Sequence, residues 1–162
     1  MTSYYRVGTA KLAALSFCTL GFYSIYWFYR QWQAEGEEHD ESYSAPFRAM
    51  FSALTAYSLF SRIHAALSLD GDRPGFSPGL YAVAYFVLVT AWRLPEPYSL
   101  IALLWFIPIV HIQQAINTNV RKHDPTASLN ETWEWWAFFL ACVGGTFMLI
   151  GVVGTLLPEL AE

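Results

Sequence analysis

The chain has 162 residues, about the length of one domain, and 55% of them are hydrophobic whereas only 14% are charged. A water-soluble domain carries about 25% charged residues, so this composition excludes an ordinary soluble globule. The net charge of −4 is small and the charged residues are scattered along the chain, which argues against nucleic acid as a partner. We therefore expect the lipid bilayer to surround most of the chain.

Five apolar segments follow one another, and each has the periodicity of a helix rather than the alternation of a strand. They predict an all-α fold, an integral membrane helical bundle that forms a single domain over residues 1–162. The expected spans are approximately 12–29, 45–67, 79–93, 98–120 and 132–157. The bundle has five spans in this prediction, or four if segment 45–67 lies at the membrane surface.

Segment 12–29 follows Lys11 and ends at Arg30. It has roughly 17 apolar residues, the lower limit for crossing a bilayer. Its second half and the residues just after it are rich in aromatic rings, including Tyr26, Trp27, Tyr29 and Trp32. Tyr and Trp gather at headgroup depth because each has an apolar ring with one polar atom. The cluster is therefore predicted to be an interfacial belt that closes the first span.

Segment 45–67 is open to two interpretations. Arg48 and Arg62 are fourteen residues apart, about 21 Å along a helix, which is shorter than a hydrocarbon core of about 30 Å. A polar stripe with Ser52 and Thr55 favours a helix lying in the interface, whereas alanines repeated every four residues favour a short, tilted span. We expect the tilted span, with Arg48 paired to headgroups or, across the bundle, to Glu131 or Glu134.

Segments 79–93 and 98–120 are joined by a proline-rich reversal, and the second of them becomes polar at its end. Its polar residues are His111, Gln113, Gln114 and Asn117. Polar side chains within a membrane often mark a pathway, but the pattern here favours a helix that has already left the hydrocarbon. His64 and His111 would differ in depth by roughly 9 Å, which argues against a shared haem.

Segment 132–157 begins with a second aromatic belt of tryptophans at 133, 135 and 136. Glu131 and Glu134 stand where acids suit the positive end of a helix. Small residues then recur near one face of the segment, a pattern typical of close helix–helix contact. The predicted helix-packing residues are Ala137, Ala141, Gly144, Gly151 and Thr155.

Positive residues near span ends predict the orientation in the membrane. In the five-span arrangement, six of them lie on the N-terminal side, together with Arg121 and Lys122, and three lie on the other side. In the four-span arrangement, six again lie on the side of Arg121 and Lys122 and three on the other. Both arrangements place Arg121 and Lys122 in the cytoplasm and the C-terminus outside. Only the side of the N-terminus differs between them.

Chemical motifs are scarce in this sequence. Cys18 and Cys142 both lie in apolar runs, which predicts packing thiols rather than a disulfide, and no metal spacing is present. We predict no cofactor and no metal ion. The lack of a phosphate loop, a nucleophile elbow or a dinucleotide fingerprint favours a protein that is not an enzyme.

Three stretches carry a resemblance to a known family: "KLAALSFCTLGFYSIYWFYRQW", "PFRAMFSALTAYSLFSRI" and "WRLPEPYSLIALLWFIPIVHIQQAIN". They resemble a family of uncharacterised bacterial membrane proteins, a domain of unknown function, and the similarity covers about Lys11 to Pro158. The resemblance implies the bacterial inner membrane but no activity, substrate or catalytic residue. The acidic stretch from Glu131 to Glu134 departs from the family pattern.

These features favour an accessory or structural subunit of a larger membrane assembly, acting through helix–helix contacts with a membrane-protein partner or a second copy. One alternative is a bundle that binds a small apolar or lipid ligand among its aromatic residues. Another is a small transporter or membrane enzyme that uses the polar residues at the end of segment 98–120.

Overall fold

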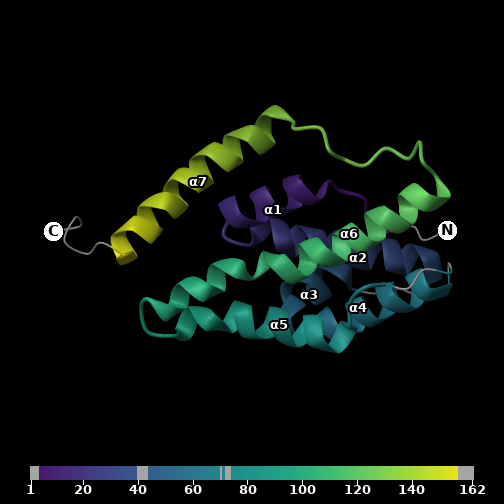
Figure 1. Cartoon of the computed structure of the whole chain (residues 1–162), viewed down its shortest axis with the longest axis horizontal. Helices are drawn as coiled ribbons and strands as arrows, with labels where there is room; N and C mark the ends of the chain where they lie inside the picture. The colour runs from purple at the N-terminus through teal and green to yellow at the C-terminus, as the bar shows by residue number, and fades with distance from the viewer. Residues whose placement is uncertain (1–3, 40–43, 70, 72–73, 157–162) are drawn as a thin grey trace.

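The computed structural model describes residues 4–39, 44–69, 71 and 74–156 (Figure 1). The regular secondary structure of this part of the chain is helical, apart from one isolated bridge between Val7 and Asn130. The all-α prediction is confirmed. The helices are α1 (Thr9–Cys18), α2 (Phe22–His39), α3 (Ala45–Met50), α4 (Ser52–Leu69), α5 (Pro78–Thr90), η1 (Ala91–Arg93), η2 (Tyr98–Leu104), α6 (Phe106–His123) and α7 (Trp135–Leu156).

Two helices in the described part of the chain are long and apolar enough to cross a membrane. One is the continuous run of η2 and α6, Tyr98–His123, with 26 residues, and the other is α7, with 22 residues. The described helices therefore support fewer spans than the five expected. Leu157, the predicted end of the last span, and Arg73, one of the counted cations, lie outside the described residues.

The first expected span is not one helix, because the chain turns between α1 and α2. Leu20 has φ 54° and Gly21 φ 92°, a left-handed conformation that glycine adopts without steric cost. The Thr19 hydroxyl donates to the Leu15 carbonyl at 2.7 Å and accepts from the Tyr23 backbone N–H at 2.9 Å. Thr19 thus closes α1 and caps α2, and the two helices are 10 and 18 residues long.

The aromatic cluster of α2 belongs to the core. Trp27 and Trp32 are fully buried, and Phe28 stacks on Phe60 of α4 with ring centroids 5.9 Å apart. The prediction of an interfacial belt is therefore wrong for both tryptophans, although Tyr26 remains exposed. Burial against α3 and α4 outweighs the interfacial preference of the indole rings.

Segment 45–67 is also divided, with a break at Phe51 between α3 and α4. The Thr55 hydroxyl donates to the Arg48 carbonyl at 2.7 Å, a carbonyl close to the end of α3. α3 packs on α2, and α4 packs mainly on α5. Neither α3 nor α4 is among the helices long and apolar enough to span a membrane, so the expected tilted span is not supported.

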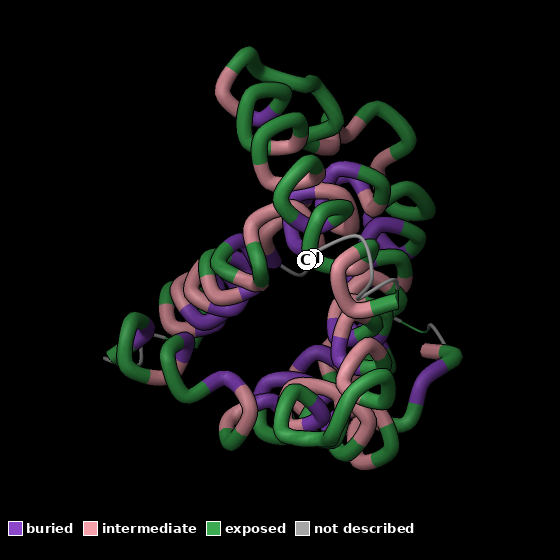
Figure 2. The backbone as a smooth tube through the Cα atoms, turned by 90° about the vertical axis from the view of Figure 1, so that its left-hand side faces the viewer, coloured by how far each residue is buried: buried purple, intermediate pink, exposed green. Residues whose placement is uncertain are grey.

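α7 is attached to the bundle along only part of its length. It packs on α1, and only 11% of its most apolar stretch is buried. Figure 2 shows exposed residues continuing along the outer faces of the helices, with buried residues on the faces that meet their neighbours. Large exposed apolar side chains run along α7, including Phe138, Phe139, Phe147, Leu149, Ile150 and Val153.

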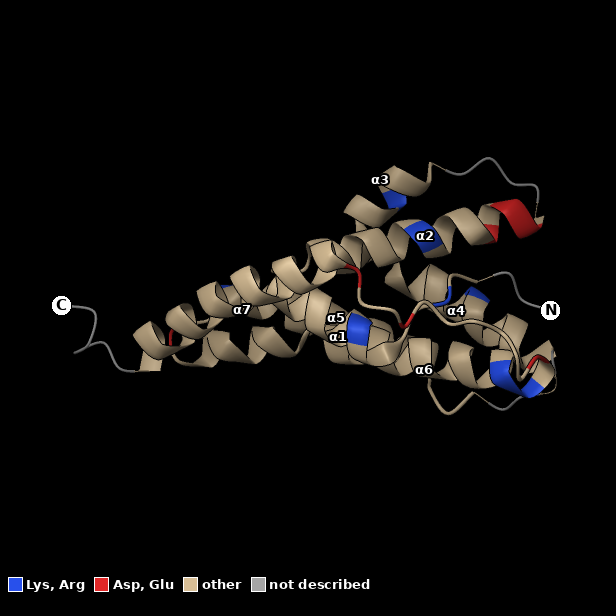
Figure 3. Ribbon diagram, turned by 90° about the horizontal axis from the view of Figure 1, so that it is seen from above, with Lys and Arg blue, Asp and Glu red and all other residues tan. Residues whose placement is uncertain are grey.

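Charge divides the molecule along its long axis. Lys, Arg, Asp and Glu gather where α2 and α6 end, and few lie beside the second half of α7 or the reversal between η1 and η2 (Figure 3). We call these the charged end and the apolar end. An end with few charges and many exposed apolar side chains suits lipid rather than water.

Candidate functional site

The polar residues predicted near the end of segment 98–120 lie on two different faces of α6. Gln113 and Asn117 are buried, whereas His111 and Gln114 are exposed on the other side. They therefore do not form one pathway. The two faces have separate partners and separate roles.

The buried face holds an extended N-terminal strap, defined as Tyr4–Gly8. Gln31 of α2 pairs with both backbone groups of Tyr5: its side-chain oxygen accepts from the Tyr5 N–H at 3.1 Å, and its nitrogen donates to the Tyr5 carbonyl at 3.2 Å. The Asn117 amide donates to the Val7 carbonyl at 2.9 Å. Side-chain amides thus satisfy backbone groups of the strap, in addition to its one bridge with Asn130.

Gln113 connects these contacts at the centre of the bundle. Its nitrogen donates to the Tyr5 carbonyl at 3.2 Å and to Asn117 Oδ1 at 2.8 Å, and its oxygen accepts from Trp27 Nε1 at 2.6 Å. Each buried amide in this network has partners for its donor and its acceptor. Such a network stabilises one arrangement of the core, so we assign Gln113 and Asn117 a structural role.

Glu35 is a buried carboxylate that joins the strap, α2 and α4. The Tyr4 hydroxyl donates to Glu35 Oε2 at 2.6 Å, Arg62 Nη1 donates to Oε1 at 3.1 Å, and His39 Nδ1 lies 3.4 Å from Oε1. Burial, together with the hydrogen bond to Glu35, raises the pKa of Tyr4 well above its usual value. The predicted residue Arg62 is therefore part of an ion pair inside the protein.

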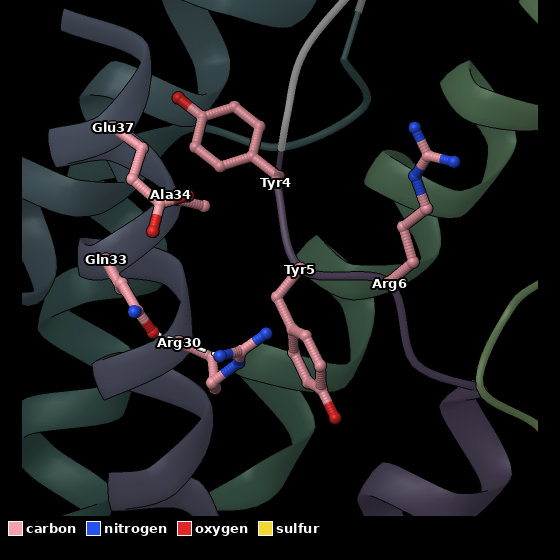
Figure 4. A pocket seen from close by; sticks show the side chains of 7 residues that line it. All are labelled: Tyr4, Tyr5, Arg6, Arg30, Gln33, Ala34 and Glu37. Atoms are coloured by element: carbon pink, nitrogen blue, oxygen red, sulfur yellow. Dashed lines mark hydrogen bonds between the residues drawn. The ribbon is translucent and has the colours of Figure 1, made fainter.

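A pocket of about 330 Å³ opens between the strap and α2, and we call it the strap pocket (Figure 4). It is lined by Tyr4, Tyr5, Arg6, Arg30, Gln33, Ala34 and Glu37. The Arg30 guanidinium lies over the Tyr5 ring at 5.2 Å, and its Nη1 donates to Gln33 Oε1 at 3.0 Å. Arg30 Nε is buried and has no hydrogen-bond partner.

The exposed face of α6 lines a smaller pocket of about 200 Å³. His111 and Gln114 lie there with Thr118 and Lys122. The His111 ring is held by Tyr81 of α5, whose hydroxyl is 2.7 Å from His111 Nδ1 and whose ring stacks on the imidazole. The transporter or enzyme hypothesis is therefore limited to His111 and Gln114 on this exposed face of α6, because Asn117 is buried on the other face.

The other predicted polar residues have different neighbours from those expected. The Arg48 guanidinium lies 4.5 Å from the centre of the Trp32 ring, a cation–π contact. Glu131 forms an ion pair with Arg121 at 2.9 Å, and both side chains are exposed. Glu134 accepts a hydrogen bond from Trp136 Nε1. Ion pairs this exposed contribute about 0–1 kcal/mol, so Arg121 and Glu131 add little to stability.

The predicted packing residues of α7 divide at the middle of the helix. Ala137 is fully buried, and a Cβ atom on Gly144 would lie 1.8 Å from the Cys18 carbonyl oxygen. Ala141 is half-buried between them. Gly151 is exposed, with nothing within 4 Å of a Cβ at its position. Half-buried Thr155 lies beyond it, so the second half of this face turns toward open space.

That space is an apolar pocket of about 480 Å³ between α7 and the η1–η2 reversal, which we call the α7 groove. It is lined by Leu20, Trp92, Leu94, Glu96, Ser99, Leu100, Leu103, Phe147, Met148, Gly151, Val152 and Thr155. Glu96 is the one charged residue in this lining. An apolar cavity with a few polar groups is typical of a small-molecule site.

No group of three or more His, Cys, Asp or Glu residues is placed to hold a metal ion in the described part of the chain. The two histidines considered for haem have aromatic partners instead, because His64 meets Phe76 edge-on and His111 stacks on Tyr81. Cys18 and Cys142 are both free thiols.

Sequence patterns overlooked Glu35 and the groove. Glu35 reads as the start of a solvated acidic run, yet it continues the buried face of α2 formed by Ser24, Trp27, Phe28, Gln31 and Trp32. That helical spacing is the signal that could have placed it in the core. The groove joins residues from three distant segments, and no local pattern marks it.

Comparisons with known protein families, with curated proteins and with solved structures found no significant match to this chain. The resemblance of its aromatic stretches to an uncharacterised bacterial membrane family stays a prediction. The pockets and buried clusters described above are therefore what indicates a function.

Proposed function

We propose that this chain is an integral protein of the bacterial inner membrane that holds an amphipathic, lipid-like molecule in the α7 groove. The α7 groove carries this proposal, because its lining is apolar except for Glu96 and the hydroxyls of Ser99 and Thr155. Its volume of about 480 Å³ falls within the range of about 300–1,000 Å³ typical of ligand pockets. An apolar tail would fill the groove, with a polar head near Glu96.

The neighbouring elements support a position within the bilayer. α7 has 22 residues, about 33 Å at a rise of 1.5 Å per residue, which matches a hydrocarbon core of about 30 Å. The run of η2 and α6 is longer still. In this arrangement the apolar end enters the membrane, the charged end with Arg121 and Lys122 faces the cytoplasm, and α7 ends at the outer surface.

The proposal is tested by filling the groove. Gly151→Phe places a ring in the groove, at a position where an added Cβ would meet no other segment within 4 Å. Leu149→Phe changes an exposed α7 residue outside the groove. Native mass spectrometry of each protein, purified in mild detergent, measures the lipid or pigment that remains bound. We expect an amphiphile on the wild type and on Leu149→Phe, and its loss from Gly151→Phe. Equal retention by all three, or none on the wild type, would contradict the proposal.

A second function is favoured by a separate observation, the exposed outer face of α7. Phe138, Phe139 and Phe147 are all at least 60% exposed, and α7 packs on the described remainder of the chain mainly through α1. This surface suits the accessory-subunit role, with a helix of a partner or a second copy against it. Purification from membranes with a stoichiometric partner, lost when Phe139 is changed to Ala, would favour this role over ligand binding.

A further inference from the structure

The strap pocket lies at the charged end, and its chemistry differs from that of the α7 groove. We propose that it binds a small zwitterion of the phosphoethanolamine class, with the phosphate at Arg30 and the ammonium group at Glu37. This inference is independent of the proposed function, because the two pockets share no lining residue.

The position and contacts of Arg30 suit the binding of an anion. Arg30 is half-buried, its guanidinium lies over the Tyr5 ring, and it donates a hydrogen bond to the neutral amide of Gln33. Among the described residues no carboxylate lies within ion-pair distance of it, and its Nε has no partner. A guanidinium held over a ring in this way presents a fork of N–H donors that matches the oxygens of a phosphate.

Glu37 supplies the opposite charge on the same face of α2. Arg30, Gln33 and Glu37 are spaced three and four residues apart, so they follow one another along that face. Arg30 and Glu37 are separated by about 10.5 Å along the helix axis, and both long side chains line the pocket between them. Figure 4 shows these three side chains on the α2 side, with Tyr4 and Tyr5 across from them on the strap.

The net charge of the lining selects the class of ligand. Arg6, Arg30 and Glu37 together carry two positive charges and one negative charge. A phosphomonoester of an amino alcohol carries the complementary set, close to two negative charges on phosphate and one positive charge on nitrogen at neutral pH. The volume of about 330 Å³ is at the small end for ligand pockets, which suits a headgroup rather than a lipid tail.

The test is a calorimetric titration of the purified, detergent-solubilised protein with O-phosphoethanolamine and with inorganic phosphate. We expect phosphoethanolamine to bind at least about tenfold more tightly than phosphate, because it contacts both charged ends of the pocket. Arg30→Gln should weaken both ligands about tenfold, and Glu37→Gln should remove the preference while phosphate still binds. Arg93→Gln, which removes one positive charge outside the pocket, is the matched control and should change neither value.

Two further measurements make the result decisive. Thermal unfolding identifies variants that have lost the fold, and Arg30→Lys, which keeps the charge but loses the fork, serves if Arg30→Gln unfolds. Nanodiscs with phosphatidylethanolamine that compete with the soluble ligand would identify a lipid headgroup as its source, and no competition would identify the free compound. No binding of either compound by the wild type would overturn the proposal, as would unchanged binding by a folded Arg30 variant or a preference that survives Glu37→Gln.

Discussion

Tyr4 is the residue that joins the strap to the buried carboxylate of Glu35. Its hydroxyl is only 2.6 Å from Glu35 Oε2, and Arg62 approaches the other carboxylate oxygen at 3.1 Å. A buried charge is tolerated when it is paired and hydrogen-bonded in this way. Glu35 therefore depends on side chains from the strap and from α4, and the strap depends on Glu35.

Tyr4 makes stability sensitive to alkaline pH. Its folded pKa is raised above the unfolded value of about 10, so the protonated form is favoured by folding. This contribution is fully present below pH 10 and is lost as pH rises above it, by up to about 1.4 kcal/mol per pH unit. Unfolding between pH 8 and 11 should therefore show a steeper loss of stability for the wild type than for Tyr4→Phe. Parallel profiles would contradict this account of Tyr4.

Local patterns could predict some residue roles and not others. Polar residues on an apolar helix single out Gln113 and Asn117 directly. Their partners are backbone groups of the strap, at sequence separations of 108 and 110 residues, so periodicity cannot show what these amides bind. The two walls of the α7 groove, residues 92–103 and 147–155, are also distant in sequence, so no local motif marks the groove.

At the scale of elements, the helical class was predictable because apolar residues recur every three or four positions. The breaks at Thr19–Gly21 and at Phe51 were not, since apolar residues continue through both of them. Hydropathy alone merges two helices into one span at each place. The Thr-Leu-Gly sequence before Phe22 was the local signal for the first break, because glycine accepts the positive φ found there.

The contact of α7 with α1 depends on Gly144. A methyl group on this residue would meet the Cys18 carbonyl oxygen at 1.8 Å, so Gly144→Ala should move α7 away from α1. We expect a loss of about 1–3 kcal/mol of stability, the usual cost of overpacking. Gly154→Ala is the control, because nothing lies within 4 Å of its Cβ position and alanine favours a helix by up to about 1 kcal/mol. Thermal unfolding in detergent should rank Gly144→Ala lowest, and equal stability of both variants would contradict the contact.

At the scale of the whole molecule, the separation of charged and apolar ends predicts one orientation in the proposed membrane arrangement. The strap lies at the charged end, because Tyr4 bonds to Glu35 and because Asn117, which holds Val7, is four residues from Arg121. The N-terminal segment and the Arg121–Lys122 pair should therefore share one side of the membrane. The five-span expectation also places the N-terminus on the side of Arg121 and Lys122, and this location stays a prediction.

Cysteine labelling in intact cells tests this orientation. Cys18 and Cys142 are first changed to Ser, and Glu96→Cys and Lys122→Cys are then introduced separately. Both new positions are exposed. A membrane-impermeant maleimide should label the Glu96 position from outside and reach the Lys122 position only after the cells are opened. The reverse pattern would show that the orientation is opposite to the predicted one. Labelling of both positions in intact cells would contradict their separation across the membrane.

The amide contacts of the strap also constrain the order of events during synthesis. Tyr5 and Val7 are translated more than a hundred residues before Gln113 and Asn117, which hold them. Until α6 has been made, the strap lacks these amide partners. The strap therefore takes its final position late, although it precedes α6 in the chain.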